Sequence, residues 1–424
     1  MKEKYEYFTL WAADRAARGA PKGASILMTW RRWGLKDNPY TLNDINETTL
    51  DLFVGRSNEI KCLQNALTGN KRIIFLEGDQ GTGKTTVGNF WRYSSMQKRL
   101  CFTPYIEICV GSPANFYSFT MNVIEALNWS LPQNHPFILR DAEFKAHENK
   151  SKEFFDALIV RKSSDQPLTD VEDRYLYSEA KGLFESVSHI VSKLSYEYGA
   201  IIQISFTELN QNSAGEDFFD FKKKLCELLA IEGFRWLLIG KPLLEELLYH
   251  SESRILPNDF YKILIGPLDL SQVHELLLRR KDYLGLNQNA KLPLAPEVVE
   301  YLYLLGDGNL TKIFPICEKI TELPSGYQAM PELDLKLTKP LIAKYFQDEI
   351  RQRWKLSPAS ADILSFLVRE EGVSPCVIAD RMRKLRPNVS KILMNLKQIN
   401  LVRAEVKGRN RVYYPSMAAK IAFA

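Results

Sequence analysis

Short apolar runs alternate along this chain with longer stretches of helical periodicity. The runs are rich in β-branched and aromatic residues, which favours buried strands over residues 73–76, 100–110, 200–206, 235–239 and 261–265. Strands that alternate with helices predict an α/β fold built on a doubly wound parallel sheet.

A helix is expected directly before the first of these strands. Ser57 or Asn58 can cap its start, and Ile60, Leu63 and Leu67 recur on one face. Further along, residues 112–196 are mainly helical in pattern, with a polar middle at 147–175 that we interpret as an insertion or surface loop.

Three more helical patterns follow the last strand, over residues 270–284, 295–305 and 309–320. Residues 323–340 contain three prolines and are interpreted as a linker, with a further helix over 341–354.

The last 70 residues or so have regular helix starts. Ser357 and Ser374 each precede a proline, and Pro387 marks a third start. The expected apolar stripes consist of Ile363, Leu367, Ile378, Met382, Leu385, Val389, Ile392, Leu393 and Leu396. Two β-rich segments then flank residues 407–411. Three helices followed by a hairpin with a basic tip predict a winged helix-turn-helix, and this stretch resembles the MarR-like transcriptional regulators.

The most specific motif in the chain follows the first strand. Residues 78–85 fit G-x-x-x-x-G-K-[ST] without a mismatch. Glycines allow the backbone N–H groups to turn inward around phosphate oxygens, Lys84 adds a charge for the β- and γ-phosphates, and Thr85 offers a hydroxyl to Mg²⁺. The predicted phosphate site consists of Gly78, Asp79, Gln80, Gly81, Thr82, Gly83, Lys84, Thr85 and Thr86.

A second box, Leu52 to Arg56, precedes this loop by about 20 residues. Together with the helix between them, the two motifs resemble the AAA+ and STAND ATPases, within them the archaeal-type branch that includes the origin-recognition initiators. The resemblance implies ATP and Mg²⁺ as cofactors, and it implies that Val54, Gly55 and Arg56 contact the nucleotide.

The chain departs from this family at the hydrolytic positions. The third strand normally ends in Asp-Glu; here Thr207 stands at the Asp position, and Glu208 at the Glu position. Gly240 and Lys241 follow the fourth strand, where the family has a polar sensor residue. Asn309 stands where the lid would have its sensor arginine. We therefore expect tight ATP–Mg²⁺ binding with slow hydrolysis, unless a partner or neighbouring subunit completes the site.

Two residues are candidate catalytic groups. Glu208 would activate the attacking water, although a solvated residue at a strand end fits equally well. Arg254 matches a family position for an arginine finger, and the alternative is a plain surface arginine.

Charge is distributed unevenly. The whole chain carries +5, but residues 351–424 hold 15 Lys and Arg against 5 Asp and Glu, or +10, so the rest carries −5. A basic C-terminal region is typical of contact with a polyanion. The predicted duplex-DNA contacts are Arg383, Lys384, Arg386, Asn388, Ser390, Lys391, Asn395, Lys407, Arg409 and Arg411. A winged helix used for protein contacts is the alternative.

We predict five segments: an N-terminal arm (1–37), the ATPase core (38–267, with a helical insertion at 112–196), a helical lid (268–322), a linker and connecting helix (323–350), and the winged helix (351–424). The arm carries Trp30, Arg31, Arg32 and Trp33; we favour its packing against the ATPase core over nucleic-acid binding. Scattered cysteines and histidines show no metal-ligand spacing. No membrane span or signal peptide is expected, so we interpret the protein as cytoplasmic.

The function predicted from these features is an ATP-switched DNA-binding protein, acting as a homo-oligomer or with a protein partner in replication, in mobile-element or defence control, or in transcription control. Three alternatives stay open: an active DNA-stimulated loader or remodeller, a signalling or scaffold ATPase that assembles with proteins, and a pure transcription regulator.

Overall fold

The computed structural model describes residues 30–69, 71–111, 114–162, 168–206, 216–248, 260–322, 332–350, 355–407 and 410–423. These residues form two compact units. One spans Asn43–Leu276, and the other combines the residues up to Leu42 with those from Leu277 onward.

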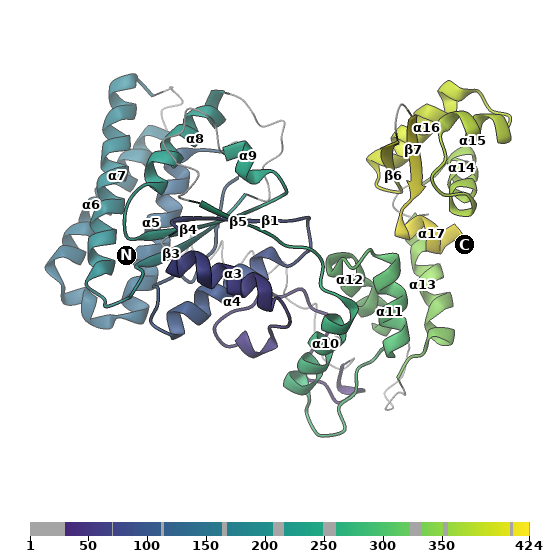
Figure 1. The fold of residues 1–424 in the computed structure, drawn as a ribbon, viewed down its shortest axis with the longest axis horizontal. Coiled ribbons are helices and arrows are strands. Elements are labelled where there is room, and N and C mark those ends of the chain that lie inside the picture. Colours follow the sequence, from purple (N-terminus) through teal and green to yellow (C-terminus); the bar gives the residue numbers. More distant parts are fainter. Residues whose placement is uncertain are drawn as a thin grey trace. The chain divides into compact units, whose positions relative to one another are not determined.

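A five-stranded parallel sheet forms the centre of the first unit (Figure 1). Its strand order is β2-β3-β4-β1-β5, with pairing that is parallel throughout. The strands are β1 (Ile73–Glu77), β2 (Ile108–Cys109), β3 (Ala200–Ser205), β4 (Phe234–Gly240) and β5 (Phe260–Leu264). The predicted α/β fold with a central parallel sheet is confirmed.

Helices cover both faces of this sheet (Figure 1). They are α3 (Ser57–Thr68), α4 (Lys84–Gln97), α5 (Phe116–Asn134), α6 (Ala142–Lys162), α7 (Asp170–Ser192), α8 (Glu216–Leu229) and α9 (Leu244–Leu248), with short 3₁₀ turns at Leu50–Leu52 and Pro136–Arg140.

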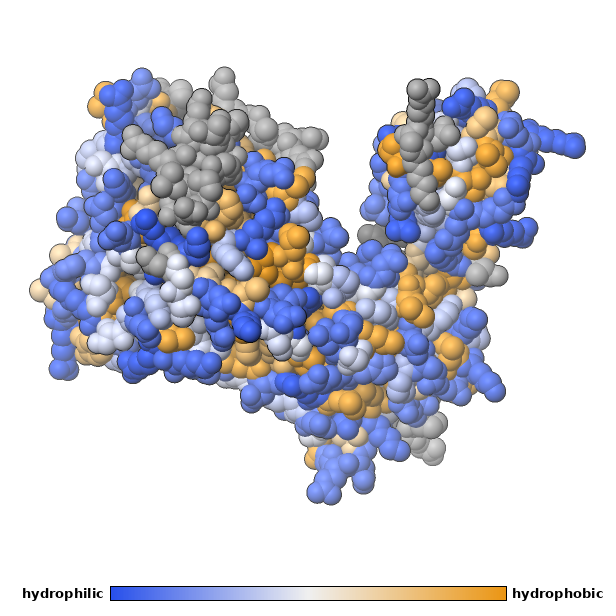
Figure 2. Space-filling model, in the orientation of Figure 1, coloured by the Kyte–Doolittle hydropathy of each residue, from blue (hydrophilic) through white to orange (hydrophobic). Residues whose placement is uncertain are grey.

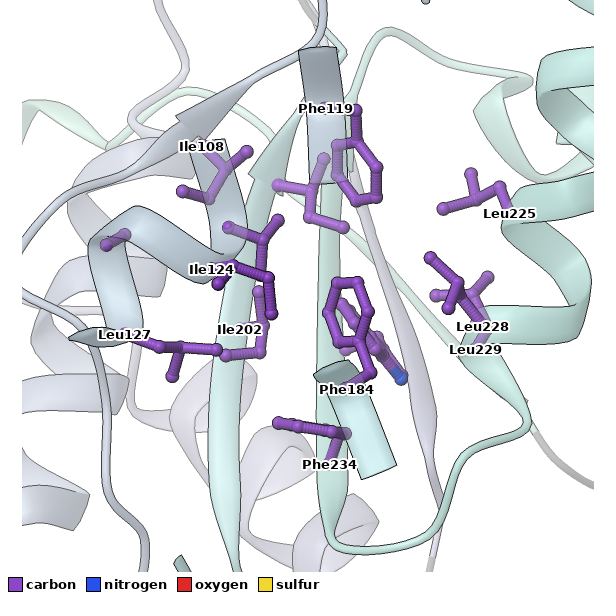
Figure 3. Close-up of a cluster of buried hydrophobic side chains, with 14 of the residues drawn as sticks. Ile108, Phe119, Ile124, Leu127, Phe184, Ile202, Leu225, Leu228, Leu229 and Phe234 are labelled. Atoms are coloured by element: carbon purple, nitrogen blue, oxygen red, sulfur yellow. The ribbon is translucent and has the colours of Figure 1, made fainter. Parts of the chain in front are cut away.

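Alternate residues of each strand face opposite layers, because successive side chains of a strand point to opposite sides. Ile73 and Phe75 join the core beneath α5, α7 and α8, part of which Figure 3 shows. Ile74 and Leu76 join the core beneath α3 and α4. Because helices cover both faces of the sheet, the strands are apolar at nearly every position. This is why short apolar runs in the sequence predicted where the strands lie.

The second strand is much shorter than predicted. Of residues 100–110, only β2 and a single bridge from Phe102 to Ala200 pair with β3. Pro104 has no N–H to donate, and its carbonyl oxygen accepts from the buried Arg92 guanidinium. The Tyr105 carbonyl accepts from the Tyr93 hydroxyl at 2.9 Å. Side chains of α4 therefore donate hydrogen bonds to carbonyl oxygens that would pair with a neighbouring strand if β2 were longer.

Two further expectations in this unit are corrected. Neither Ser57 nor Asn58 caps α3; Arg56 occupies the N-cap with φ 62°, in the left-handed region, and no side chain caps the helix. The polar stretch 147–175 is helical up to Lys162 and again from Asp170, where Thr169 and Glu172 form a reciprocal capping box.

The described part of the N-terminal arm packs within the second unit, not against the sheet. Trp30 and Trp33 are buried, and Trp30 lies edge-on to Tyr40. Tyr40 in turn contacts Phe314, and the Arg280 guanidinium donates to the Thr41 carbonyl at 2.6 Å. The tryptophans thus serve as core residues beside the helices that follow residue 277, because large aromatic rings gain most from burial.

The helices of this region are α10 (Leu270–Leu284), which crosses the boundary between the two units at Leu276–Leu277, and α11 (Pro296–Leu305), α12 (Leu310–Glu322) and α13 (Leu335–Glu349). The first three match the sequence patterns closely. The fourth begins earlier than predicted, since Asp334 caps it by accepting from the Leu337 N–H at 2.8 Å, and Pro340 lies inside the helix. Part of the predicted linker is therefore helical; residues 323–331 lie outside the described residues.

The C-terminal elements are α14 (Pro358–Arg369), α15 (Pro375–Arg381), α16 (Arg386–Gln398), the antiparallel pair β6 (Val402–Lys407) and β7 (Asn410–Pro415), and α17 (Met417–Phe423). Ser357 and Ser374 cap α14 and α15 as predicted. The expectation for Leu385 was wrong: α15 ends at Arg381, so Leu385 precedes α16 and is 73% exposed.

No described helix is long and apolar enough to cross a membrane. All six cysteines lie among the described residues, and no disulfide joins any of them. Figure 2 shows hydrophilic side chains over most of the visible face of each unit.

Candidate functional site

The loop between β1 and α4 has the strand–loop–helix geometry that the phosphate motif requires. Gly81 and Gly83 have φ of 85° and 86°, a region that side chains rarely adopt. Gly78 is needed for a different reason, because a Cβ atom there would lie 2.3 Å from the Ile265 carbonyl oxygen. The three glycines of the motif therefore have physical roles in shaping the loop.

Lys84 begins α4 and is only 6% exposed. Its Nζ donates to the carbonyl oxygens of Gly78 at 2.8 Å and Asp79 at 2.7 Å, which holds the ammonium group inside the loop. Burial lowers the pKa of Lys84, Asp79 opposes the shift, and Lys241 adds to it. A partly desolvated cation surrounded by backbone groups is a favourable site for an anion.

The other predicted phosphate residues line the same turn. The Thr82 hydroxyl donates to the Asp79 carbonyl at 2.9 Å and closes the loop. Asp79 and Gln80 are exposed, while Thr85 and Thr86 are half-buried in the first turn of α4. The positive end of the α4 dipole faces this loop, which adds to its attraction for an anion.

Residues 54–56 are joined to the loop through Arg56. Its Nη2 donates to the carbonyl oxygens of Thr82 at 2.9 Å and Gly266 at 2.6 Å, and its Nη1 pairs with Glu59 at 3.0 Å. The side chain is 7% exposed. Arg56 therefore braces the loop against the segment after β5, and its contact with a nucleotide stays a prediction.

Val54 and Gly55 precede this brace. Val54 is buried, and Gly55 has φ 66°, with the Gln272 side chain within 2.6 Å of where a Cβ would lie. Their contact with a nucleotide likewise stays a prediction.

Glu77, the last residue of β1, was not singled out from the sequence. Its carboxylate is fully buried and accepts the N–H groups of Leu243 at 2.9 Å and Glu245 at 2.7 Å. Lys262 of β5 pairs with it at 3.2 Å. The sequence does show a charged residue at the end of an apolar strand, directly before the motif, and this could have drawn attention to Glu77. Its partners, however, lie far away in sequence.

The predicted hydrolytic residues, Glu208 and Arg254, both lie outside the described residues. Asn309, at the expected sensor position, accepts the N–H and hydroxyl of Thr311 at 3.1 and 2.6 Å at the start of α12. Its observed role is to cap a helix.

A bound Mg²⁺ needs several oxygen ligands. Thr85 offers a hydroxyl, but the Glu77 carboxylate is already engaged by two N–H groups and Lys262. Among the described residues, no group of three or more His, Cys, Asp and Glu side chains could hold a metal ion. The described residues therefore fit Mg²⁺ only in part, and the remaining oxygens would have to come from the nucleotide and water.

A second candidate site lies on α16. Val389, Leu393 and Leu396 are buried, while Asn388 and Lys391 lie exposed on the opposite face. Asn395 is also exposed on this face, and Ser390 is half-buried.

Cations surround the start of α16 and the hairpin. Arg383 and Arg386 are exposed, but Lys384 lies 3.6 Å from the Asp362 carboxylate. Arg411 is exposed on β7. Lys407 ends β6, but its side chain and all of Arg409 lie outside the described residues.

No protein-family model and no curated protein matches this chain. Among solved structures, it is similar to the Orc1 protein of Aeropyrum pernix in complex with DNA (15% identity, 89% of this chain and 96% of that chain, TM-score 0.44). It is also similar to the Orc2 protein of the same organism in ADPNP–ADP complexes (14% identity, 91% and 97% covered, TM-score 0.42). A third similar structure is Cdc6p from Pyrobaculum aerophilum (10% identity, 91% and 97% covered, TM-score 0.37). Identities and TM-scores this low do not assign a function to this chain.

Proposed function

We propose that this protein binds ATP at the loop 78–83 and duplex DNA through α16 and the β6–β7 hairpin, and that the nucleotide switches DNA binding. The observation that carries the proposal is the buried Lys84 ammonium, held within a glycine-rich loop at the start of a helix. A loop of this kind is built for the phosphates of a nucleotide.

The loop and the residues around it have distinct roles in this proposal. The glycine backbone places N–H groups around the phosphates, Lys84 neutralises the β- and γ-phosphate oxygens, and Arg56 keeps the loop in shape. Thr85 would hold Mg²⁺ together with phosphate oxygens, and the ion would supply charge neutralisation at the same phosphates.

The C-terminal elements support the DNA half of the proposal. Helices α14–α16 and the hairpin have the order of a winged helix-turn-helix, with exposed Asn388, Lys391 and Asn395 on one face of α16. Amide side chains and a lysine are suited to base edges in the major groove, and the surrounding cations are suited to phosphates. The charge of +10 over residues 351–424 favours DNA over a protein partner.

Hydrolysis is proposed to be weak or partner-dependent. Thr207 cannot supply the carboxylate that the related ATPases have at this position, so stabilisation of the transition state is reduced more than binding. Glu208 and Arg254 are the residues proposed to carry the remaining activity.

Equilibrium binding of a fluorescent ATP analogue tests the proposal, with Lys84→Ala as the inactive control and steady-state ATP turnover measured with and without duplex DNA. We expect saturable binding that Lys84→Ala abolishes, with turnover near the control level. Turnover raised several-fold by DNA would instead favour a loader or remodeller. Equal binding by the wild type and Lys84→Ala would overturn the nucleotide site.

A further inference from the structure

Aromatic side chains gather at the edge of the sheet where the parallel strands begin. The phosphate loop lies at the opposite edge, since it follows the end of β1. At the starting edge, Phe102 forms the bridge to Ala200, the first residue of β3, and packs edge-on against Tyr196. The Tyr196 hydroxyl lies 2.9 Å from Nε2 of His135, which directly follows α5. This edge is therefore separate from the proposed nucleotide site.

Ring contacts and hydrogen bonds join these side chains into one cluster. Trp129 packs edge-on against Tyr105 with ring centroids 5.7 Å apart, and the Tyr105 hydroxyl donates to the Asn134 side-chain oxygen at 2.8 Å. His135, the next residue, packs edge-on against Phe137 at 5.6 Å. The cluster thus extends from the end of α5 into the turn after it. We name its members the ring surface: Tyr105, Trp129, His135, Phe137 and Tyr196.

Two members of the ring surface are open to solvent. Phe137 is 65% exposed and Trp129 is 44% exposed. In the 3₁₀ turn Pro136–Arg140, Ile138 is buried, whereas Phe137 and Leu139 on either side of it are exposed. One exposed apolar side chain is ordinary, but several in one region mark an interaction site. Because the rings that contact them are hydrogen-bonded in place, Trp129 and Phe137 form a pre-organised contact surface.

A cation lies beside these rings. Arg99 is exposed and forms no ion pair with a described residue. Burial lowers the pKa of His135 and the Arg99 charge adds to the shift, while burial raises the pKa of Tyr196 and Arg99 opposes it, so the guanidinium lies near both rings. Arg99 has φ 56°, and Ser195, next to Tyr196, has φ 58°. Left-handed backbone is uncommon for such residues, and positions of this kind gather at functional sites.

A second cation, Arg140, lies at the end of the 3₁₀ turn. It is exposed and likewise pairs with no described carboxylate. The carboxylates that follow it in the chain are engaged elsewhere: Asp141 accepts the N–H groups of Glu143 and Phe144 at 2.8 and 2.9 Å, and Glu143 pairs with Lys193 at 2.5 Å. Among the described residues, positive charge without a carboxylate partner therefore borders the ring surface at two positions.

We propose that the ring surface binds single-stranded nucleic acid. Its bases stack on Trp129 and Phe137, and the two neighbouring arginines contact its phosphates. Every base has a flat π-face, so exposed rings beside cations suit a strand of any sequence, whereas a duplex keeps its base faces inside the stack. An apolar protein segment would cover the rings but leave both arginines unpaired. This site goes beyond the proposed function, which assigns duplex DNA to α16 and the β6–β7 hairpin.

Fluorescence anisotropy of labelled probes tests the proposal, with oligo(dT) and oligo(U) of about 20 nucleotides, an abasic strand of the same length, and a duplex. The variants are Trp129→Ala, Phe137→Ala and Arg386→Ala, and Phe219→Ala, at an exposed phenylalanine of α8, is the matched control. We expect Trp129→Ala and Phe137→Ala each to weaken single-strand binding by about 5-fold or more, and duplex binding by less than about 2-fold. Arg386→Ala should instead weaken mainly duplex binding. The oligonucleotide that binds more tightly, oligo(dT) or oligo(U), identifies the strand as DNA or RNA.

Thermal melting shows whether each variant is folded, and Trp129→Phe, which keeps a stacking ring in place, should retain most of the single-strand affinity. No binding of either oligonucleotide, or equal binding of oligo(dT) and the abasic strand, would overturn this inference. Wild-type single-strand affinity in both Trp129→Ala and Phe137→Ala would overturn it too. The proposed function fails separately: a protein that binds single strands through these rings but binds no duplex would contradict that function and leave this inference standing.

Discussion

Arg56 and Thr82 are joined by a hydrogen bond of 2.9 Å from the guanidinium Nη2 to the carbonyl oxygen, although 26 positions separate them in the chain. The same nitrogen donates to Gly266 at 2.6 Å. One side chain thus ties together the start of α3, the phosphate loop and the segment after β5. The two motifs of the nucleotide site form one structural unit, in which Arg56 positions the loop.

Replacing Arg56 should damage both stability and nucleotide binding. In Arg56→Ala, the carbonyl oxygens of Thr82 and Gly266 lose a charged donor that is itself buried, so we expect the free energy of unfolding to fall by about 2 kcal/mol and the ATP dissociation constant to rise. Arg56→Lys should recover little, because a single ammonium group lacks the planar fork by which the guanidinium reaches the two carbonyls with Nη2 and Glu59 with Nη1. Urea denaturation and ATP titration measure the two effects. Arg140→Ala, at an exposed arginine, is the control; an Arg56→Ala protein with wild-type stability and affinity would refute the brace.

Two glycines should respond in opposite directions to alanine. At Gly78 the added Cβ meets the Ile265 carbonyl oxygen at 2.3 Å, and main chain cannot move aside cheaply, so Gly78→Ala should cost about 2 kcal/mol of stability. Gly182 is exposed inside α7, and beyond the helix's own nearby backbone no atom lies within 4 Å of the new Cβ, so Gly182→Ala should gain about 0.5–1 kcal/mol from helix propensity. Both are read from urea midpoints, and equal shifts would contradict the geometry.

His147 should make the protein sensitive to mild acid. It is 1% exposed, its Nε2 lies 3.0 Å from the Asn128 amide oxygen, and burial lowers its pKa from 6.5 to about 4. In the unfolded chain the His147 imidazole is protonated below about pH 6.5, whereas in the folded protein it stays neutral down to about pH 4. The stability that His147 contributes is therefore fully present above pH 6.5 and is lost as the pH falls from 6.5 to about 4. The loss amounts to about 3 kcal/mol.

Unfolding free energies at pH 7, 6, 5 and 4 test this expectation. His147→Gln should show a flatter dependence over the window, although its stability at neutral pH is lower. His274→Gln should keep the wild-type dependence. If His147→Gln loses stability with acid as steeply as the wild type does, another group is responsible.

Two neighbouring cations at the start of α16 should differ in their effect on DNA binding. Arg386 is exposed and forms no ion pair with a described residue, whereas Lys384 lies 3.6 Å from Asp362. Arg386→Ala should weaken binding to any duplex and reduce the salt slope by about 1. Lys384→Ala should do less, because its ion pair must open before it meets a phosphate. Anisotropy of a labelled duplex at several salt concentrations measures this, and equal slopes for the two variants would count against it.

Local patterns predicted the elements whose stability is local. The helices at 270–284 and 309–320 were found because their apolar positions repeat with the helical period, and β1 and β4 because both of their faces are buried. The loop glycines followed from the same local chemistry. Contacts between distant segments decided the rest: the Arg92 guanidinium shortened β2, and the early end of α15 put Leu385 outside the apolar stripe.

The site shows the same division. Lys84 and the glycines were predictable because the motif is contiguous. Glu77 was not, because its role depends on N–H groups 166 and 168 positions away. Lys241 was visible in the sequence only as a departure from a family position, and its relation to Lys84 depends on the parallel pairing of β1 with β4.

The coupling between the two halves of the proposed function can be measured directly. The affinity for a labelled DNA duplex would be determined with a non-hydrolysable ATP analogue, with ADP and without nucleotide, for the wild type and for Lys84→Ala. We predict that the analogue changes the wild-type affinity by at least about 5-fold and leaves that of Lys84→Ala unchanged. A wild-type affinity that is the same in all three states would contradict an ATP-switched DNA-binding protein.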